Sequence, residues 1–462
     1  MNTISKIGAI GALAFLCFVW GVVATSTKIF PHHQIVRVQN GIDAIGKMED
    51  SELPQHVIAL TPDASRTDPI QSFAPVTSDD LILMTGGFFY RQDQCPNYGC
   101  MAFITDHEGK ILHKWEFDPA GLFTPDDFKA FTGYPDPRNL NVQGVDMDAD
   151  GNLIVVFQGR NVFPYQVGIA KFDWNSKLLW IKIDNSHHWP KVGPDGRIYT
   201  PIAKIERGAQ TVAATPQPSE CKSGAIFQEG VRVLAPDGTT LKEFWMKDVV
   251  KASDMQGLAY SVRNDCDPYH VNGIDLVTAA TAARLPELRA GDLLVSLRSS
   301  SALVVLDQDT GLIKHIVSGP MVAQHSPHAL LNGNFAVFDN LGGLDTENGT
   351  RVLEINSISG VGRTLFPRDK SAPGGDLSSD AQGTIAFSAD QARMLVGETL
   401  GGRVFEVDTA TGAPLWQYDL ISDLAPFYKS IGKEKSGPTY GRMQAQGARY
   451  VTRADFDRMM AQ

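Results

Sequence analysis

The sequence has no run of basic residues, and its charge balance is acidic. Its 41 lysines and arginines are outnumbered by 52 aspartates and glutamates, which gives a formal net charge of −11 at pH 7. Proteins that bind nucleic acid carry a basic patch or stripe, so this class of partner is excluded. An acidic balance mainly favours solubility.

Cysteine is scarce, with five residues in 462, and none is spaced as C-x-x-C. Cys17 lies inside an apolar segment and leaves Cys95, Cys100, Cys221 and Cys266 in the rest of the chain. An even number of cysteines in an oxidising compartment predicts two disulfides. The pair in CPNYGC would close a tight loop, and Cys221 with Cys266 follows by elimination. Free thiols or a metal site are the alternative.

Residues 7–25 read IGAIGALAFLCFVWGVVAT, an uncharged stretch preceded by Lys6 and about long enough to cross a bilayer as a helix. We therefore predict that residues 1–27 form a transmembrane signal anchor and that the rest of the chain is exported to the periplasm or a similar extracytoplasmic space. A cleaved signal peptide is the alternative, with Val22 and Ala24 as the small residues of the cleavage site. Residues 28–77, rich in Pro, Asp and Ser, are interpreted as a spacer.

Helical patterns are sparse, and short helices are expected only near 125–131, 279–288 and 452–462. One unit recurs six times instead: a β-branched run, a turn with Gly, Asp or Asn, and a second run that ends in a large apolar or aromatic residue. The copies span 100–115, 168–180, 231–245, 302–316, 350–366 and 402–418. Preceding turns imply two further strands in each repeat. This pattern predicts an all-β protein with a six-bladed β-propeller over 78–425 and a tail over 426–462.

Three turn glycines, each in a different repeat, follow a polar residue at the same distance of eight positions. The pairs are Gln143 with Gly151, His188 with Gly196, and His325 with Gly333. Because the first strand of each blade lines the central channel of a propeller, these polar side chains are expected to converge there.

The fourth repeat differs, because DPYHVNGIDLV places His270 and Asn272 two apart on one face of a strand. Its next strand, GDLLVSLRSSS, is interpreted as an apolar strand interrupted by Arg298. A buried guanidinium is costly unless it meets an anion or a carboxylate. Histidines beside an arginine suit the transfer of an oxyanion group.

The order of these motifs, HHWPKVGPDG, DPYHVNGID, SLRSSS and QHSPHALLNGNFAVFDN, resembles the bacterial arylsulfotransferase family over roughly residues 81–418. The resemblance implies a propeller enzyme that moves a sulfuryl group from a phenolic sulfate ester to a phenolic acceptor without a nucleotide sulfate donor, and no cofactor is expected. It implies that His325 is the nucleophile that becomes sulfohistidine. Arg298 and His270 would hold the sulfuryl oxygens, and His188 would assist proton movement.

Two departures from the family pattern concern the substrate side. Trp189 follows His188 where close family members often have His-Asp, and a serine run follows Arg298 in place of a His-Gln pair.

Asn272, Gln143 and His187 are expected to contact substrate. A zinc or copper site on the histidines is the chemical alternative, although the positive charge of Arg298 disfavours it. The other alternative is an exported propeller that binds a partner without catalysis.

Overall fold

The computed structural model describes residues 3–27, 57–60 and 67–461. Within the last range the gaps are 87–90, 92, 97, 117, 130, 134–139, 160–161, 208–224, 261–265, 345, 347, 426–428 and 430–439. The chain divides into two units, Met1–Gln55 and His56–Gln462.

The described part of the first unit is the helix α1 (Thr3–Thr27). Among the helices of the described residues, none has both the length and the apolar character that crossing a bilayer requires. The predicted transmembrane helix is therefore not found.

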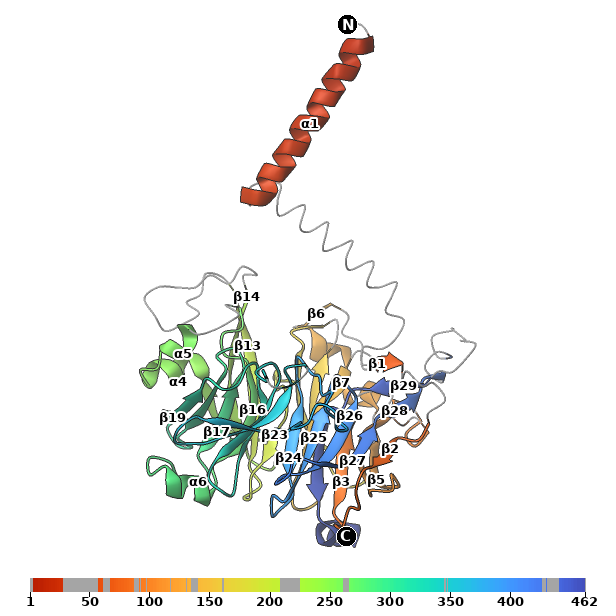
Figure 1. The fold of residues 1–462 in the computed structure, drawn as a ribbon, viewed down its shortest axis with the longest axis vertical. Helices are drawn as coiled ribbons and strands as arrows, with labels where there is room; N and C mark the ends of the chain where they lie inside the picture. The colour runs from red at the N-terminus through yellow and green to blue at the C-terminus, as the bar shows by residue number, and fades with distance from the viewer. Residues whose placement is uncertain are drawn as a thin grey trace. The chain divides into compact units, whose positions relative to one another are not determined.

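The second unit is a propeller of six antiparallel sheets, and this prediction is confirmed (Figure 1). From the channel outward, blade 1 contains β30 (Gly447–Val451), β3 (Leu81–Thr85), β4 (Cys100–Thr105) and β5 (Ile111–Glu116), and blade 2 contains β7 (Leu140–Met147), β8 (Leu153–Gly159), β10 (Gln166–Phe172) and β11 (Leu178–Lys182). Blade 3 contains β12 (Lys191–Val192), β13 (Ile198–Arg207), β14 (Ala225–Leu234) and β15 (Thr240–Trp245), and blade 4 contains β16 (Val271–Leu276), β17 (Leu293–Leu297), β18 (Ala302–Leu306) and β19 (Ile313–Ser318). Blade 5 contains β20 (His325–Ala329), β21 (Phe335–Asp339), β22 (Arg351–Ile355) and β23 (Gly362–Phe366), and blade 6 contains β24 (Thr384–Phe387), β25 (Arg393–Glu398), β26 (Arg403–Asp408) and β27 (Pro414–Asp419).

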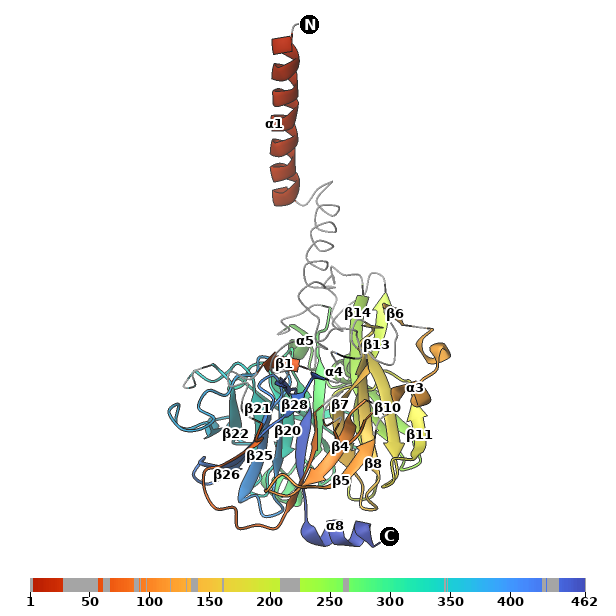
Figure 2. The same cartoon turned by 90° about the vertical axis from the view of Figure 1, so that its right-hand side faces the viewer.

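Shorter strands and helices lie outside the six blade sheets. One small sheet contains β1 (Val57–Leu60), β29 (Tyr440–Met443) and β28 (Ile421–Asp423). A second contains β6 (Thr132–Gly133) and β9 (Val162–Phe163). The helices of this unit that fall in the described ranges include α3 (Pro119–Leu122), η1 (Pro125–Phe128), α4 (Met246–Ala252), α5 (Gly257–Tyr260), α6 (Ala279–Arg284) and α8 (Arg453–Met460). The helix α8 lies at the end of the propeller opposite β6 and β14 (Figure 2).

The six repeats form the outer hairpins of the six blades, and in three of them a tryptophan near the end binds the next blade. Three indole N–H groups each donate to a backbone carbonyl in the following hairpin turn: Trp115 to Asp173 at 3.0 Å, Trp180 to Pro236 at 3.1 Å, and Trp416 to His107 at 2.9 Å. The third contact runs from blade 6 to blade 1 and so continues around the ring. The apolar core lies in layers between neighbouring blades, as with Trp115 and Phe157 in the layer shared by blades 1 and 2.

Strands from outside the predicted 78–425 range complete the ring. The innermost strand of blade 1, β30, pairs with β3 and places Val451 opposite Leu81. At the outer edge of blade 6, β2 (Ile70–Ser72) pairs with β27. Segments interpreted as spacer and tail thus contribute to the first and last blades.

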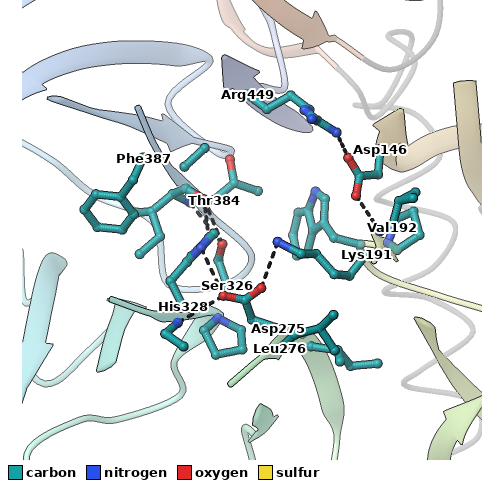
Figure 3. Close-up of a pocket in the computed structure, with 18 of the residues that line it drawn as sticks. Asp146, Lys191, Val192, Asp275, Leu276, Ser326, His328, Thr384, Phe387 and Arg449 are labelled. Atoms are coloured by element: carbon teal, nitrogen blue, oxygen red, sulfur yellow. Dashed lines mark hydrogen bonds and ion pairs between the residues drawn. The ribbon is translucent and has the colours of Figure 1, made fainter. Parts of the chain in front are cut away.

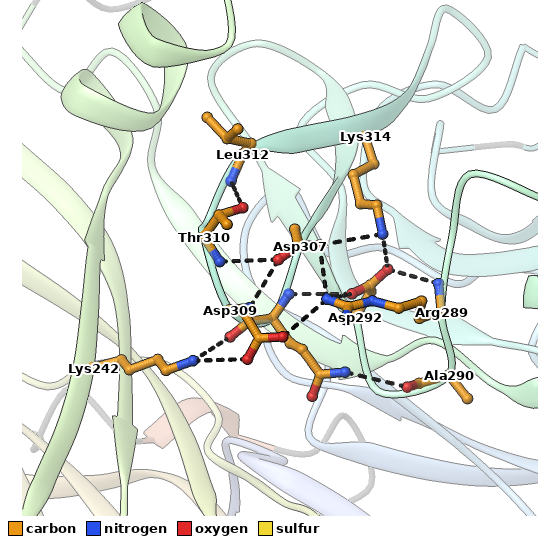
Figure 4. Close-up of polar contacts among 10 residues, drawn as sticks. Lys242, Arg289, Ala290, Asp292, Asp307, Asp309, Thr310, Leu312 and Lys314 are labelled. Carbon is orange, nitrogen blue, oxygen red and sulfur yellow. Dashed lines mark hydrogen bonds and ion pairs between the residues drawn. The ribbon is translucent and has the colours of Figure 1, made fainter.

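Blades 3 and 4 are also joined by an ion-pair network (Figure 4). Lys242 on β15 contacts Asp309 in the next hairpin turn at 3.1 Å, and Arg289 contacts the same aspartate at 3.1 Å. Lys314 reaches the fully buried Asp292 at 2.9 Å. Each carboxylate here faces at least one cation, so the network serves to hold the two blades together.

The predicted disulfide between Cys95 and Cys100 is confirmed. Cys266 is also disulfide-bonded, whereas Cys221, its predicted partner, lies outside the described residues. That pairing stays a prediction.

Candidate functional site

Three histidines from three blades meet at one end of the central channel. His188 lies just before β12, His270 directly precedes β16, and His325 opens β20. The ring centroid of His188 is 5.2 Å from that of His270 and 5.9 Å from that of His325. The structure therefore brings together three of the four residues expected to carry the chemistry.

Two of these histidines have left-handed backbone conformations. The φ angle is 57° at His188 and 48° at His270, a region that costs a side chain with a Cβ about 1 kcal/mol or more. Neighbouring groups hold both residues in place: the Gln143 side chain accepts a hydrogen bond from the His188 N–H at 2.8 Å, and the His270 carbonyl accepts one from the Arg298 N–H at 3.1 Å. Such strain is typical of functional sites.

The partner of His325 determines which ring nitrogen is protonated. Asn340 Nδ2 donates to the Ser379 and Gln382 carbonyls at 2.7 and 2.6 Å, so its Oδ1 is the atom that faces His325 Nδ1 at 2.8 Å. An amide oxygen only accepts, and Nδ1 must therefore carry the proton. Nε2 of His325 keeps its lone pair.

The charge state of His325 agrees with this tautomer. Burial, together with the positive charges of His270 and Arg298, lowers the pKa of His325 to about 3 despite the opposing hydrogen bond from Asn340. The imidazole is therefore neutral at neutral pH, the form that a nucleophile requires.

His270 has a carboxylate partner instead. Its Nδ1 forms a short contact with Asp267. Burial alone would raise the pKa of Asp267, but the charge and hydrogen bond of His270 outweigh it and lower that pKa. An ionised aspartate behind an imidazole stabilises the imidazolium form. Asp267 was missed as a site residue, although its position three residues before His270 in DPYH was the available signal.

His188 is backed by His187. The two Nδ1 atoms lie 2.5 Å apart, and His187 Nε2 lies 4.0 Å from Oε1 of Glu229. Burial and the charge of His270 lower the pKa of His187 to about 3, and burial with the charges of neighbouring histidines lowers the pKa of His188 well below its ordinary value. His187, expected to contact substrate, is fully buried behind His188.

Glu229 is a second residue that the sequence analysis missed. It is fully buried on β14, its carboxyl accepts the Val271 N–H, and its pKa is raised well above the ordinary value by burial and by the charge of Asp267. An acidic residue within the strand FQEGVRVL was the available signal.

Arg298 lies in the turn that directly follows β17 rather than inside a strand, so the predicted interruption of an apolar strand is corrected. The turn releases the side chain from the alternation of the sheet. Its charge contributes to the lowered pKa values of His188 and His325. Among the described residues, no hydrogen bond or ion pair uses its guanidinium. Its donors are thus available to an anion.

The other two expected substrate contacts are engaged with the backbone. Gln143 holds the N–H of His188, as described above, and Asn272 Nδ2 donates to the Gln324 carbonyl at 2.7 Å. Both side chains are buried. They fix the histidine-bearing segments, and the Oδ1 of Asn272 lacks a partner in the described structure.

Two sets of side chains have ligand atoms within 4.8 Å of one another and so meet the distance condition for a metal site. The sets are His188, His270 and His325, and Glu229, Asp267 and His270. An imidazole whose second nitrogen bonds a carboxylate or an amide is a common metal ligand. The free guanidinium of Arg298 opposes a cation and favours an anion at the same place.

Comparisons with known proteins give one family match and several similar solved structures. A family profile described as arylsulfotransferase (ASST) matches residues 144–419, more than half of the chain. No curated protein matches the sequence. Solved structures similar to this one include a protein of unknown function from Bacteroides caccae, with 12% identity over 81% of this chain and 99% of that chain and a TM-score of 0.44. Another is a virginiamycin B lyase from Staphylococcus aureus, with 10% identity over 61% and 71% of the two chains and a TM-score of 0.34.

Proposed function

Since the chain belongs to the arylsulfotransferase family, we propose that it transfers a sulfuryl group from a phenolic sulfate ester to a phenolic acceptor through a sulfohistidine at His325. The observation that carries this proposal is the contact of Asn340 with Nδ1 of His325, which leaves a neutral imidazole with a free Nε2 lone pair. The unpaired guanidinium of Arg298 beside it supports an anionic substrate.

In the first step Nε2 of His325 attacks sulfur, and the bond from sulfur to the phenolic oxygen breaks. Arg298 donates hydrogen bonds to the sulfuryl oxygens and stabilises their negative charge. His270, whose Nδ1 contacts Asp267, gives a proton to the departing phenolic oxygen. The phenol leaves, and His325 carries the sulfuryl group.

The second step reverses these roles. The acceptor phenol transfers its proton to His270 and attacks sulfur, and the bond from sulfur to Nε2 breaks. This assigns proton transfer to His270 rather than to His188, the residue that the family resemblance implies. His188 is neutral, and its Nε2 donates a hydrogen bond to a sulfuryl oxygen while Nδ1 accepts one from His187.

We also propose an extracytoplasmic location. The disulfide between Cys95 and Cys100 and the disulfide-bonded Cys266 support it, because such bonds persist in oxidising compartments and are rare in the cytosol.

The test is transfer from 4-nitrophenyl sulfate to phenol by the full chain, compared with His325→Ala. We expect nitrophenol release that depends on phenol, and a covalent sulfuryl group mapped to His325 by peptide mass spectrometry after rapid quenching. His315→Ala, on the outer strand β19, is the matched control and should keep full activity. A folded wild-type protein that transfers no sulfuryl group from several aryl sulfates would contradict the proposal and favour the non-catalytic binding module.

A metal centre on the same histidines is the second candidate, because their ring nitrogens lie within 4.8 Å of one another. Metal analysis of the purified protein separates the two. Sulfuryl transfer that is unchanged by a chelator supports the covalent route, and stoichiometric zinc or copper whose removal abolishes activity supports the metal.

A further inference from the structure

A second space opens in the channel beyond the histidines, at the end where the innermost strands finish. It is a cavity of about 740 Å³ whose lining includes His328 and the charged residues Asp146, Lys191, Asp275 and Arg449 (Figure 3). A cavity of this size has room for many water molecules, since one water occupies about 30 Å³ of liquid.

The cavity stops directly beneath the histidine site. Its lining includes Trp189 and Ser326, which immediately follow His188 and His325 in the chain. None of the described lining residues is itself one of the three histidines or Arg298. The boundary between the cavity and the site therefore lies at the level of Trp189.

The indole of Trp189 is fixed at this boundary. Its Nε1 donates to the Gln446 carbonyl at 2.6 Å, and its ring meets the His325 ring edge-on at a centroid distance of 6.2 Å. The position of Gly144 shows how closely the chain packs here, since a Cβ at that residue would lie 2.8 Å from both Cα and Cδ1 of Trp189. A glycine at 144 is thus required for the indole to occupy this place.

A proline from blade 5, Pro327, also lines the cavity. Pro327 packs over Gly273, where an added Cβ would lie 2.4 Å from its Cδ. Both the indole and the pyrrolidine ring line the cavity and present apolar surface to it.

We propose that Trp189 seals the channel beneath His325 and keeps cavity water from the sulfohistidine, so that the sulfuryl group passes to a phenol rather than to water. This inference rests on the proposed function. In the competing reaction a water oxygen attacks sulfur, the bond from sulfur to Nε2 breaks, one water proton goes to His270, and hydrogen sulfate leaves. A phenol approaching from the histidine end reacts in the same way but does not have to pass the indole.

The experiment measures how the sulfuryl group divides between phenol and water. Full-length wild type, Trp189→Ala and Trp189→Phe are given 4-nitrophenyl sulfate and phenol, and phenyl sulfate and free sulfate are quantified. We expect Trp189→Ala to raise the ratio of free sulfate to phenyl sulfate about tenfold or more, because loss of the ring admits water. Trp189→Phe keeps a ring at the boundary and should stay near the wild-type ratio.

Further variants keep the test decisive. If Trp189→Ala does not fold, Trp189→Leu opens part of the same gap, and Gly144→Ala displaces the indole from the other side. An unchanged ratio in any folded, active variant of Trp189 that lacks the ring overturns the seal while leaving the proposed function intact. Failure of wild type to form phenyl sulfate overturns the proposed function and the seal with it.

Discussion

The histidine site and the charged cavity beneath it are built from successive residues of the same inner strands. They differ in whether their charged side chains form ion pairs. In the cavity Lys191 pairs with Asp275 at 2.8 Å, and Arg449 pairs with Asp146 (Figure 3). In the site, the Arg298 guanidinium has no ion-pair partner among the described residues.

Several buried polar atoms of the site also lack a hydrogen-bond partner among the described residues. Polar atoms without a hydrogen-bond partner in the described structure include His187 Nε2, Glu229 Oε1, Asp267 Oδ1 and Asn272 Oδ1. A buried polar group that lacks a partner costs about 1–3 kcal/mol, and the left-handed His188 and His270 add strain. The difference teaches that the cavity pairs its charges for stability, whereas the site leaves the guanidinium of Arg298 to a bound substrate.

The strongest way to sharpen this comparison is Arg298→Ala. We expect kcat/KM for aryl sulfate to fall by about 10²–10³-fold, because a charged donor to the transition state is lost. The melting temperature should hold or rise, since the guanidinium forms no ion pair with any residue in the described part of the chain. Steady-state kinetics and thermal unfolding measure both. Retained activity, or a large loss of stability, would place Arg298 with the structural charges instead.

Asp267→Asn tests whether the carboxylate behind His270 serves proton transfer. We expect kcat to fall about 10–100-fold, because the imidazolium loses its anionic partner. The loss should be larger for sulfate esters of weakly acidic phenols than for 4-nitrophenyl sulfate, whose leaving group needs less protonation. An equal loss for all esters would point to a purely structural role for Asp267.

The pH dependence of stability separates the buried histidines from the ion pairs. The unfolded pKa of histidine is about 6.5, and that of folded His325 is about 3. Between these values the unfolded state binds a proton that the folded state excludes, so stability falls as the pH drops below about 6.5. Urea unfolding should show that wild type loses about 2 kcal/mol more than His325→Gln between pH 7 and 5. Parallel losses would contradict a neutral buried imidazole.

Asp275→Asn should give the smallest effect. In contrast to Arg298→Ala, it should lower stability slightly and leave activity nearly unchanged. Asparagine keeps an acceptor for the Ala329 N–H, which Asp275 accepts at 3.0 Å, but loses the charge that faces Lys191. Because Lys191 is about one-third exposed, we expect a cost of only about 1 kcal/mol and kcat within about twofold of wild type. A large loss of kcat with unchanged stability would break the comparison.

Much of this architecture follows from local sequence. The six outer hairpins were predictable because each depends on turn residues next to its own strands, and the eight-residue spacing brought His188 and His325 to the same channel. The partners of the histidines could not be predicted in this way, because Glu229 and Asn340 reach them from other strands and loops. The position of Arg298 was predicted only approximately, since a strand end and a strand interior look alike in SLRSSS.

Ring closure was the other feature that local sequence does not reveal. The three residues of β2 carry no clear strand signal, and the sequence near β30 does not predict that it pairs with β3. The family match over 144–419 contains neither β3 nor β30, although the sheet of blade 1 consists of them together with β4 and β5.

The pairing of Leu81 with Val451 also sets the order of events during biosynthesis. Strands β3, β4 and β5 are among the first propeller strands to leave the ribosome, but their sheet lacks its innermost member until translation reaches Val451. Through that interval β3 presents an unpaired edge, which is a template for aggregation. Blade 1 is therefore completed only after β30 has been synthesised.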